Sequence, residues 1–165
     1  MTRDSSAFER QAAHNDPPMY LVTATADGAK AGCLVGFATQ CSIEPLRFVV
    51  CVSKANHTHT VASRASSLVV HALHESDREV ASLFGEHTGD EIDKFARCDW
   101  DDVPDGVALR GCDWFSGPIV GHFDGGDLDG YIIDVVDGRA RRGTEPQLGS
   151  QAVKSFEPGH PASDA

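Results

Sequence analysis

Short apolar runs separated by turn signals make up most of the chain between residues 19 and 136. These runs are rich in valine, isoleucine and aromatic residues, which is typical of β-strands. We predict strands at residues 19–25, 31–37, 46–53, 67–74, 112–123 and 130–136. Asp27-Gly28 stands between the first two runs, and both residues tolerate positive φ, so we predict a hairpin there.

Two segments show helical spacing instead. Residues 58–66 place Val61 and Ala65 four apart, as on one face of a short helix. Ser76–Glu79 fits a capping box ahead of apolar residues at helical spacing, which predicts a second helix. A further helical turn is predicted at 93–96, inside the polar stretch 85–106. Six or seven strands with two or three short helices predict a mainly β fold, and favour a small barrel over a parallel sheet.

The two ends of the chain lack this pattern. Residues 1–16 are polar and predict a flexible N-terminal arm or, alternatively, a helical turn. From Gly138 on, basic residues, proline, glycine and serine dominate, so we predict a disordered tail over residues 139–165. The structured domain is therefore predicted at residues 17–138, and a chain of 165 residues is long enough for one domain with its own core.

Charge and composition narrow the classes of partner. The formal net charge of -11 argues against nucleic acid or an anionic membrane as the main partner. No apolar run reaches the length of a transmembrane helix, and the first residues lack the apolar segment of a signal peptide. The five cysteines show no C-x-x-C spacing, and three lie in predicted strands, where a thiol is usually a small buried hydrophobe. These features predict a reduced, cytoplasmic protein.

A segment rich in hydrogen-bond donors follows the third predicted strand, where the chain turns into the first predicted helix. We call residues 54–60 the elbow. Its candidate anion-binding residues are Lys54, Asn56, His57, Thr58, His59 and Thr60. Hydroxyl, amide and imidazole groups combine there with the N–H groups and dipole of a helix start, which suits a phosphate. The alternative is a plain helix cap, with Asn56 or Thr58 as the N-cap and the histidines simply solvated.

A second candidate is the strand end at residues 36–42. Its small or hydroxylated residues allow a flat heterocycle to lie along the backbone and bond to N–H and C=O groups. The candidate residues are Gly36, Phe37, Ala38, Thr39, Gln40 and Cys41. Alone, the segment is better explained as an irregular strand end, but beside a phosphate-binding elbow it gains weight as a ring-binding site. We predict no metal site, because His71 and His74 lie on opposite faces of one strand.

The order of these motifs resembles the flavin reductase-like proteins of the FMN-binding split-barrel class, over roughly residues 17–137. Four features carry the resemblance. They are the strand 19–26 with its Asp-Gly turn, the run 32–42 followed by Ile43-Glu44-Pro45, the elbow residues 56–60, and the tract 90–96.

The resemblance implies a six-stranded Greek-key barrel, usually a homodimer with the flavin near the interface. It implies that the FMN ring lies against residues 38–41 and the phosphate at residues 54–60. The implied activity is reduction of flavin, FMN or alternatively FAD, by NADH or NADPH, often to supply a partner monooxygenase.

Two positions depart from many family members. His59 stands where many have arginine, so phosphate binding would weaken as pH rises. Many members also carry a Gly-Asp-His triplet near flavin and nicotinamide. The matching residues here are Gly126-Asp127-Leu128, which makes Asp127 a candidate cofactor-binding residue but supplies no imidazole.

Three hypotheses follow. The first is an FMN-dependent NAD(P)H:flavin oxidoreductase without a catalytic side chain, because the cofactors supply the reactivity. The second, motivated by Leu128, is a flavin-binding carrier, store or sensor without turnover. The third is a split-barrel relative that binds the deazaflavin F420 or haem.

Overall fold

The computed structural model describes residues 3–159. The strands are β1 (Tyr20–Ala26), β2 (Ala29–Val35), β3 (Ala38–Ser42), β4 (Arg47–Ser53), β5 (Ser67–Ala72), β6 (Trp100–Val103), β7 (Gly106–Leu109), β8 (Asp113–Asp124), β9 (Leu128–Asp134) and β10 (Asp137–Arg139). The helices are α1 (Ser6–His14), α2 (His57–Ala62) and α3 (Arg78–Gly85), with 3₁₀ turns at Glu75–Asp77, Lys94–Arg97 and Ser150–Val153.

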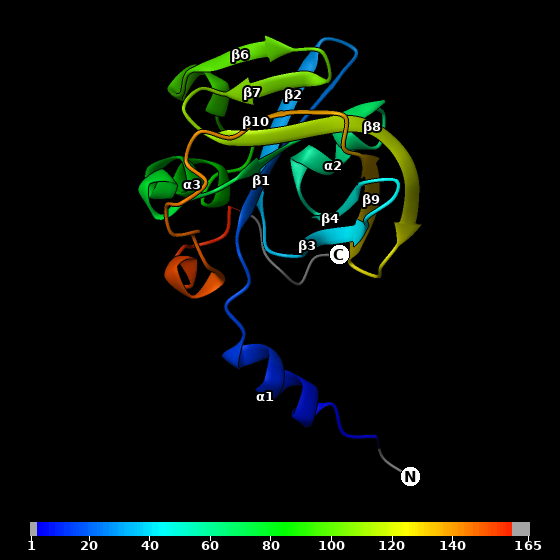
Figure 1. Ribbon diagram of the computed structural model, residues 1–165. Coiled ribbons are helices and arrows are strands. Elements are labelled where there is room, and N and C mark those ends of the chain that lie inside the picture. Colours follow the sequence, from blue (N-terminus) through cyan, green and yellow to red (C-terminus); the bar gives the residue numbers. More distant parts are fainter. Residues whose placement is uncertain (1–2, 160–165) are drawn as a thin grey trace.

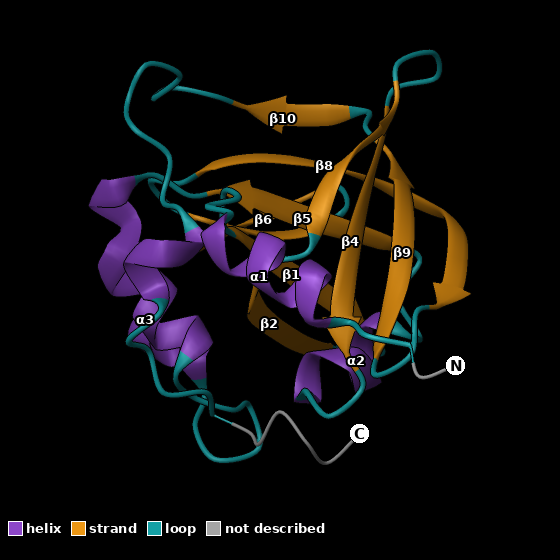
Figure 2. Ribbon diagram, turned by 90° about the horizontal axis from the view of Figure 1, so that it is seen from below, coloured by secondary structure: helices purple, strands orange, loops and turns teal. Residues whose placement is uncertain are grey.

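Seven strands form one antiparallel path in the order β2-β1-β5-β8-β9-β4-β3, and β10 pairs with β8 beside it. Strands β6 and β7 form a separate hairpin. The sheet curls around a core, with α2 near one end of the curl and α3 on its flank (Figures 1 and 2). The prediction of a mainly β split-barrel fold is confirmed, although the described residues contain more strands than the six expected.

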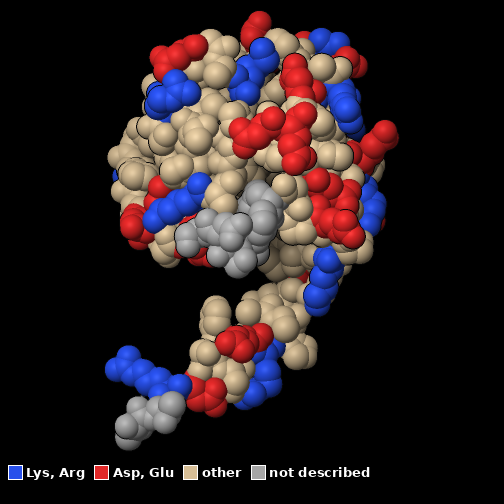
Figure 3. Space-filling view, turned by 180° about the vertical axis from the view of Figure 1, so that it is seen from behind, with Lys and Arg blue, Asp and Glu red and all other residues tan. Residues whose placement is uncertain are grey.

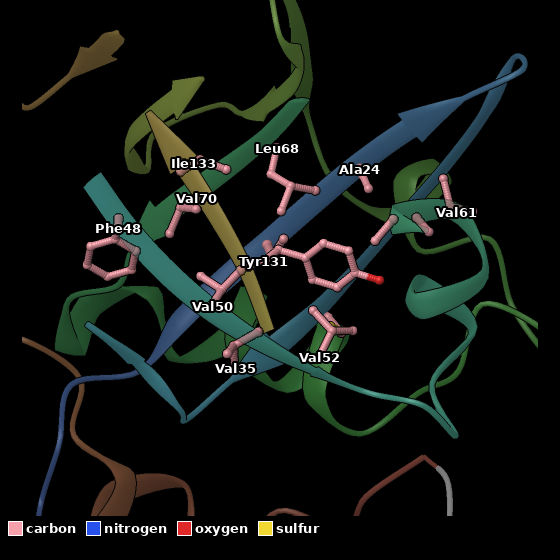
Figure 4. Close-up of a cluster of buried hydrophobic side chains, with 14 residues drawn as sticks. Ala24, Val35, Phe48, Val50, Val52, Val61, Leu68, Val70, Tyr131 and Ile133 are labelled. Carbon is pink, nitrogen blue, oxygen red and sulfur yellow. The ribbon is translucent and has the colours of Figure 1, made fainter. Parts of the chain in front are cut away.

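The interior of the curled sheet holds the larger apolar core. Alternation along β4 turns Phe48, Val50 and Val52 inward, where Tyr131 and Ile133 of β9 meet them. In Figure 4 these side chains lie together on the same face of the two strands, which pair with each other. The Tyr131 hydroxyl points toward α2 in the same view, and among the described residues it is the one buried side-chain polar atom without a hydrogen-bond partner.

A second apolar core lies on the flank of the sheet that α3 covers. Leu21, Phe84, Leu109 and Leu148 are each at most 2% exposed and come from β1, α3, β7 and the C-terminal segment. Because these four segments are far apart in the sequence, this core ties the hairpin β6–β7 and the C-terminal segment to the sheet.

Buried polar groups at this second core are fully paired. His71 of β5 donates from Nδ1 to the Leu21 carbonyl at 2.9 Å, and its Nε2 accepts from the Leu109 N–H at 2.9 Å. One partner accepts and the other donates, so the ring is neutral. Burial lowers the pKa of His71 to about 4. The Thr23 hydroxyl likewise donates to the Val107 carbonyl at 2.6 Å.

The C-terminal segment differs from the disordered tail predicted at 139–165. Asp113 accepts hydrogen bonds from the N–H groups of Arg141 and Arg142, and His74 Nε2 lies 3.2 Å from its carboxylate. Leu148 is 1% exposed in the second core. A few apolar and hydrogen-bonding anchors therefore order residues 139–159 despite their loop-like composition, and the predicted residues 160–165 of the tail lie outside the described part.

Three other elements differ from the predictions. Residues 38–42 form a separate strand, β3, rather than the end of the strand before it. The stretch 85–106 contains β6 and the first residue of β7. Each strand has only four residues, and β6 carries two aspartates, so neither shows an alternating pattern. The capping box lies at His74–Asp77 instead of Ser76–Glu79.

The N-terminal residues 6–14 form a helix of nine residues, where we expected a loose arm or a helical turn. No residue of α1 is buried, and α1 stands apart from the body in Figure 1. In Figure 3 it extends below the body and carries charges of both signs.

Candidate functional site

The candidate ring-binding residues 36–41 lie at one end of the sheet path. Ala38, Thr39 and Gln40 of β3 pair with Val50, Val49 and Phe48 of β4. The other edge of β3 carries no strand among residues 3–159. Its outward N–H and C=O groups are therefore free to bond the edge of a flat ring, as an added strand would.

The structure brings this segment next to the elbow. The Cys51 N–H donates to the Phe37 carbonyl at 2.9 Å, so residues 36–37 lie beside the last residues of β4. The elbow begins directly after that strand, at Lys54. The two segments singled out in the sequence are thus adjacent in space, as one ligand with a ring and a phosphate would require.

An apolar groove of about 730 Å³ borders β3, within the range of small-molecule sites. Ala38, Thr39 and Gln40 form one wall. Tyr20, Phe48 and Phe115 form the other, as a row of edge-to-face aromatic rings with centroids 5.1 and 4.9 Å apart. The groove therefore suits the flat, apolar part of a ligand that lies along β3.

Within the elbow, the backbone and hydroxyl groups serve the helix. Asn56 is the N-cap of α2, because its Oδ1 accepts from the Thr58 N–H at 2.9 Å. The Thr58 side chain is 1% exposed and hydrogen-bonds Cys33, whose thiol has a pKa that burial raises and this bond lowers. The Thr60 hydroxyl donates to the His57 carbonyl at 2.7 Å. The predicted cap thus exists, and Thr58 is turned inward, away from any ligand.

Lys54 and both histidines of the elbow lie against carboxylates. Lys54 Nζ lies 2.8 Å from Asp124 and 3.8 Å from Asp129. His59 Nε2 lies 2.5 Å from the Asp129 carboxylate, and His57 Nδ1 lies 2.9 Å from Asp90. The hydrogen bond that Lys54 donates to Asp124 raises the pKa of Lys54. The positive charge expected from the sequence is therefore matched by carboxylates.

Three residues of this region were not singled out from the sequence. Asp124 and Asp129 come from the ends of β8 and β9, and His122 Nε2 lies 3.7 Å from Asp129. The hydrogen bond with His59 is the main reason why the pKa of Asp129 is lowered. Burial of the carboxyl group opposes this shift, and the nearby charges of Lys54 and His59 add to it. The signal available in the sequence for Asp124 and Asp129 was their position on either side of the short turn between the last two predicted strands. In the structure the register of β8 and β9 pairs Asp124 with Asp129.

The triplet 126–128 lies in the turn of that hairpin. The Asp127 carbonyl accepts from the Lys54 N–H at 3.0 Å, while the Asp127 side chain is exposed. Leu128 opens β9 opposite Ser53. Asp127 thus contacts the elbow through its backbone, and an apolar side chain stands where many family members have an imidazole.

Other kinds of site have less support. Among residues 3–159, no group of three or more His, Cys, Asp or Glu side chains is placed to hold a metal ion. No helix in this part of the chain is both long and apolar enough to cross a membrane.

Comparison with known protein families gives one assignment: a family model described as "Flavin reductase like domain" matches residues 14–153. The FMN reductase (NADH) RutF of Methylorubrum extorquens is 27% identical over 104 residues, which are 63% of this chain and 50% of that protein. The ferric-chelate reductase (NAD(P)H) of Archaeoglobus fulgidus is 28% identical over 92 residues, 55% of this chain and 54% of that protein. The chain spans about half the length of these curated relatives.

Solved structures share the fold. The NADH:FAD oxidoreductase SgcE6 of Streptomyces globisporus superposes with a TM-score of 0.78 at 18% identity, covering 97% of this chain and 94% of that one. An FMN-binding protein from Thermus thermophilus, with bound 1-cyclohex-2-enone, has a TM-score of 0.72 at 20% identity and covers 79% and 74%. At these identities the similarity establishes the split-barrel fold.

Proposed function

This chain belongs to the flavin reductase-like domain family, and from that premise we propose that it binds FMN and passes reducing equivalents to flavin from NADH or NADPH. The observation that carries the proposal is that the open edge of β3, which borders the aromatic groove, begins beside the end of β4 that leads into the elbow. The names of the similar proteins, an FMN reductase and an NADH:FAD oxidoreductase, support the same reaction. The proposed flavin-binding domain is residues 17–138, with the packed segment up to residue 153.

The residues fit the two parts of a flavin unequally. The ring part fits well, because residues 36–41 offer backbone donors and acceptors beside an apolar groove. The phosphate would meet Lys54, His59, the Asn56 amide and the Thr60 hydroxyl, with His57 at the rim. These side chains are already paired within the protein.

A bound flavin supplies the redox chemistry, since it accepts a hydride from a nicotinamide without help from a protein nucleophile. The protein then has three tasks. The backbone of β3 orients the ring, the aromatic groove excludes water from one side of it, and the elbow accommodates the charged end. No catalytic side chain is required for this division of labour.

We further propose a homodimer that covers the outer face of β4, β8 and β9. The outward positions of an antiparallel sheet are usually polar. Here they include Val49, Cys51, Phe123, Leu128 and Ile132. Phe123 packs over Gly130, where a Cβ would lie 2.1 Å from its ring, yet it stays 44% exposed. An apolar outer face of this kind supports association with a second copy.

We also propose a cellular location and a partner protein. All five cysteines lie in the described part of the chain and are free thiols, which supports a reducing, cytoplasmic location. A partner monooxygenase that receives the reduced flavin is proposed from the family resemblance.

A second candidate function is flavin binding without turnover. Leu128 favours it, because the residue at the start of β9 can neither donate a proton nor hydrogen-bond a nicotinamide. Such a protein would carry, store or sense flavin.

One anaerobic experiment separates the two functions. Protein is mixed with FMN, NADH or NADPH is added without oxygen, and the visible band of oxidised flavin is followed. Rapid bleaching beyond the protein-free rate supports the reductase. Flavin that binds but stays oxidised supports the carrier, and no binding of FMN contradicts both.

A pair of matched variants tests the location. Thr39→Glu places a carboxylate on the exposed edge of β3, and we expect at least a tenfold rise in the KM for FMN. Thr144→Glu makes the same change at an exposed loop residue away from the site and is the control. An equal KM in the two variants would place the ring elsewhere.

A further inference from the structure

The ion pairs of the elbow bear on which flavin the site accepts. A flavin phosphate carries nearly two negative charges at neutral pH, and a site that binds this phosphate tightly has cations free to pair with it. Lys54 is the permanent cation of this elbow, and Asp124 and Asp129 both lie within 4 Å of it. Two carboxylates therefore already hold the cation that a phosphate would use.

Both carboxylates carry their charge at neutral pH. The hydrogen bond from Lys54, followed by that from the Gly126 N–H, lowers the pKa of Asp124. The hydrogen bond from His59, which outweighs burial, lowers the pKa of Asp129. An incoming phosphate would meet these negative charges together with the exposed Asp127 in the same turn.

The uncharged hydrogen-bond donors of the elbow do not compensate for the negative charge of these carboxylates. Thr58 is buried and turned toward Cys33, and the Thr60 hydroxyl is engaged with the His57 carbonyl. The Asn56 side-chain oxygen caps α2. By contrast, the aromatic groove beside β3 has one charged residue in its lining, Arg47, and Arg47 is paired with Asp134.

From this contrast we propose that Asp124 and Asp129 set the flavin specificity of the site: by pairing with Lys54 and His59 they make the protein recognise flavin through its ring, so that riboflavin is bound nearly as well as FMN. This inference rests on the proposed flavin site and deepens it. The phosphate-free flavin is then a substrate in its own right, and the two aspartates are the residues that decide it.

A purely structural role for the two aspartates makes a different prediction. If they only hold the β8–β9 turn against the elbow, their loss weakens the binding of both flavins alike. If they screen the cations, their neutralisation strengthens the binding of the flavin that carries a phosphate and leaves riboflavin unchanged. The ratio of the two dissociation constants therefore distinguishes the roles.

The experiment measures the Kd of riboflavin and of FMN by quenching of flavin fluorescence, for the wild-type protein, Asp124→Asn and Asp129→Asn. We expect the wild-type values to agree within about tenfold. Each substitution removes one negative charge a few ångströms from the phosphate, and we expect FMN to bind about tenfold more tightly, as Coulomb attraction at an intermediate effective dielectric implies. Riboflavin binding should stay the same.

Asp27→Asn is the matched control. Asp27 forms an exposed ion pair with Arg64 in the β1–β2 turn, so the same chemical change is made outside the site. We expect it to change neither Kd.

Three results would overturn the inference: a wild-type preference for FMN above a hundredfold, a ratio unchanged by both substitutions, or equal losses for both flavins. In each of these the protein still binds flavin, and the proposed function stands. If the wild-type protein binds neither flavin, the proposed function fails and this inference with it.

Discussion

The protein holds two clusters of histidines and aspartates, and they are built differently. At the second core, His71, His74, Asp77 and Asp113 are each at most 6% exposed and are bonded mainly to backbone groups. At the elbow, the side chain of Lys54 is 32% exposed and that of Asp124 is 73% exposed, and they bond to each other. The first cluster joins segments of the fold, while in the second Lys54 and Asp124 stay open to solvent, although the side chain of their neighbour Asp129 is only 12% exposed.

The two clusters differ in what replaces a hydrogen bond or an ion pair when it is broken. A buried donor or acceptor that loses its partner finds no water, so the cost falls on the stability of the fold. An exposed ion pair exchanges its partner for water or for a ligand at little cost. We therefore expect polar residues of the same types to serve stability in one region and, under the proposed function, binding in the other, and four predictions test this division.

The largest effect is expected from His71→Leu. The substitution leaves the Leu21 carbonyl and the Leu109 N–H buried without partners, and we expect a loss of about 4 kcal/mol in the free energy of unfolding. Urea denaturation measures it. His59→Leu makes the same change at the elbow and should cost far less. Equal losses would abolish the distinction between the two clusters.

The second prediction concerns the loss of folding stability at low pH. The pKa of His71 is about 4 in the folded protein against 6.5 ordinarily, so the unfolded chain takes up the proton first as pH falls. The contribution of His71 to stability is thus intact above pH 6.5 and is lost between pH 6.5 and 4. At 1.36 kcal/mol per pH unit, this loss amounts to about 3 kcal/mol.

The measurement is the free energy of unfolding as a function of pH for wild type and His71→Leu. We expect the difference between the two proteins to shrink as the pH falls through that range. A constant difference would mean that His71 is not held neutral by burial.

The third prediction compares two aspartates. Asp113 accepts from two backbone N–H groups and contacts His74. Although burial opposes it, these bonds lower its pKa. Asp113→Asn replaces one acceptor oxygen with a donor, and we expect a cost of about 2 kcal/mol. Asp124→Asn should leave thermal stability unchanged, as measured by calorimetry. A larger effect at Asp124 would make the elbow part of the structural framework.

The smallest effect is expected from Asn56→Ala. Asn56 caps α2, and loss of such a cap costs about 1 kcal/mol. If the cap is the main role of Asn56, the free energy of riboflavin binding in Asn56→Ala should change by no more than the free energy of unfolding does. Asn56→Asp should keep the cap and weaken FMN binding. Weaker riboflavin binding in Asn56→Ala beyond that cost would assign Asn56 to the ring site.

Parts of the fold with a local physical signal could be predicted. The Asp27-Gly28 turn and the runs that became β1, β4 and β5 combine turn chemistry with β-branched residues, and the structure has them within two residues of the predicted bounds. Elements held by distant contacts could not. Strands β6 and β7 and the C-terminal segment lack local pattern, and their anchors Leu109 and Leu148 become meaningful only against α3 and β1.

For the site, the sequence by itself determined which chemical groups are present: the hydroxyl, amide and cationic groups of residues 54–60 and the small residues of 36–41. These follow from composition and from order along the chain. Tertiary structure alone decided their electrostatics, because Asp124 and Asp129 reach Lys54 and His59 through the pairing of β8 with β9 and of β9 with β4. Charge acts through space with a reach of several ångströms, so residues some 70 positions apart set the charge of the elbow.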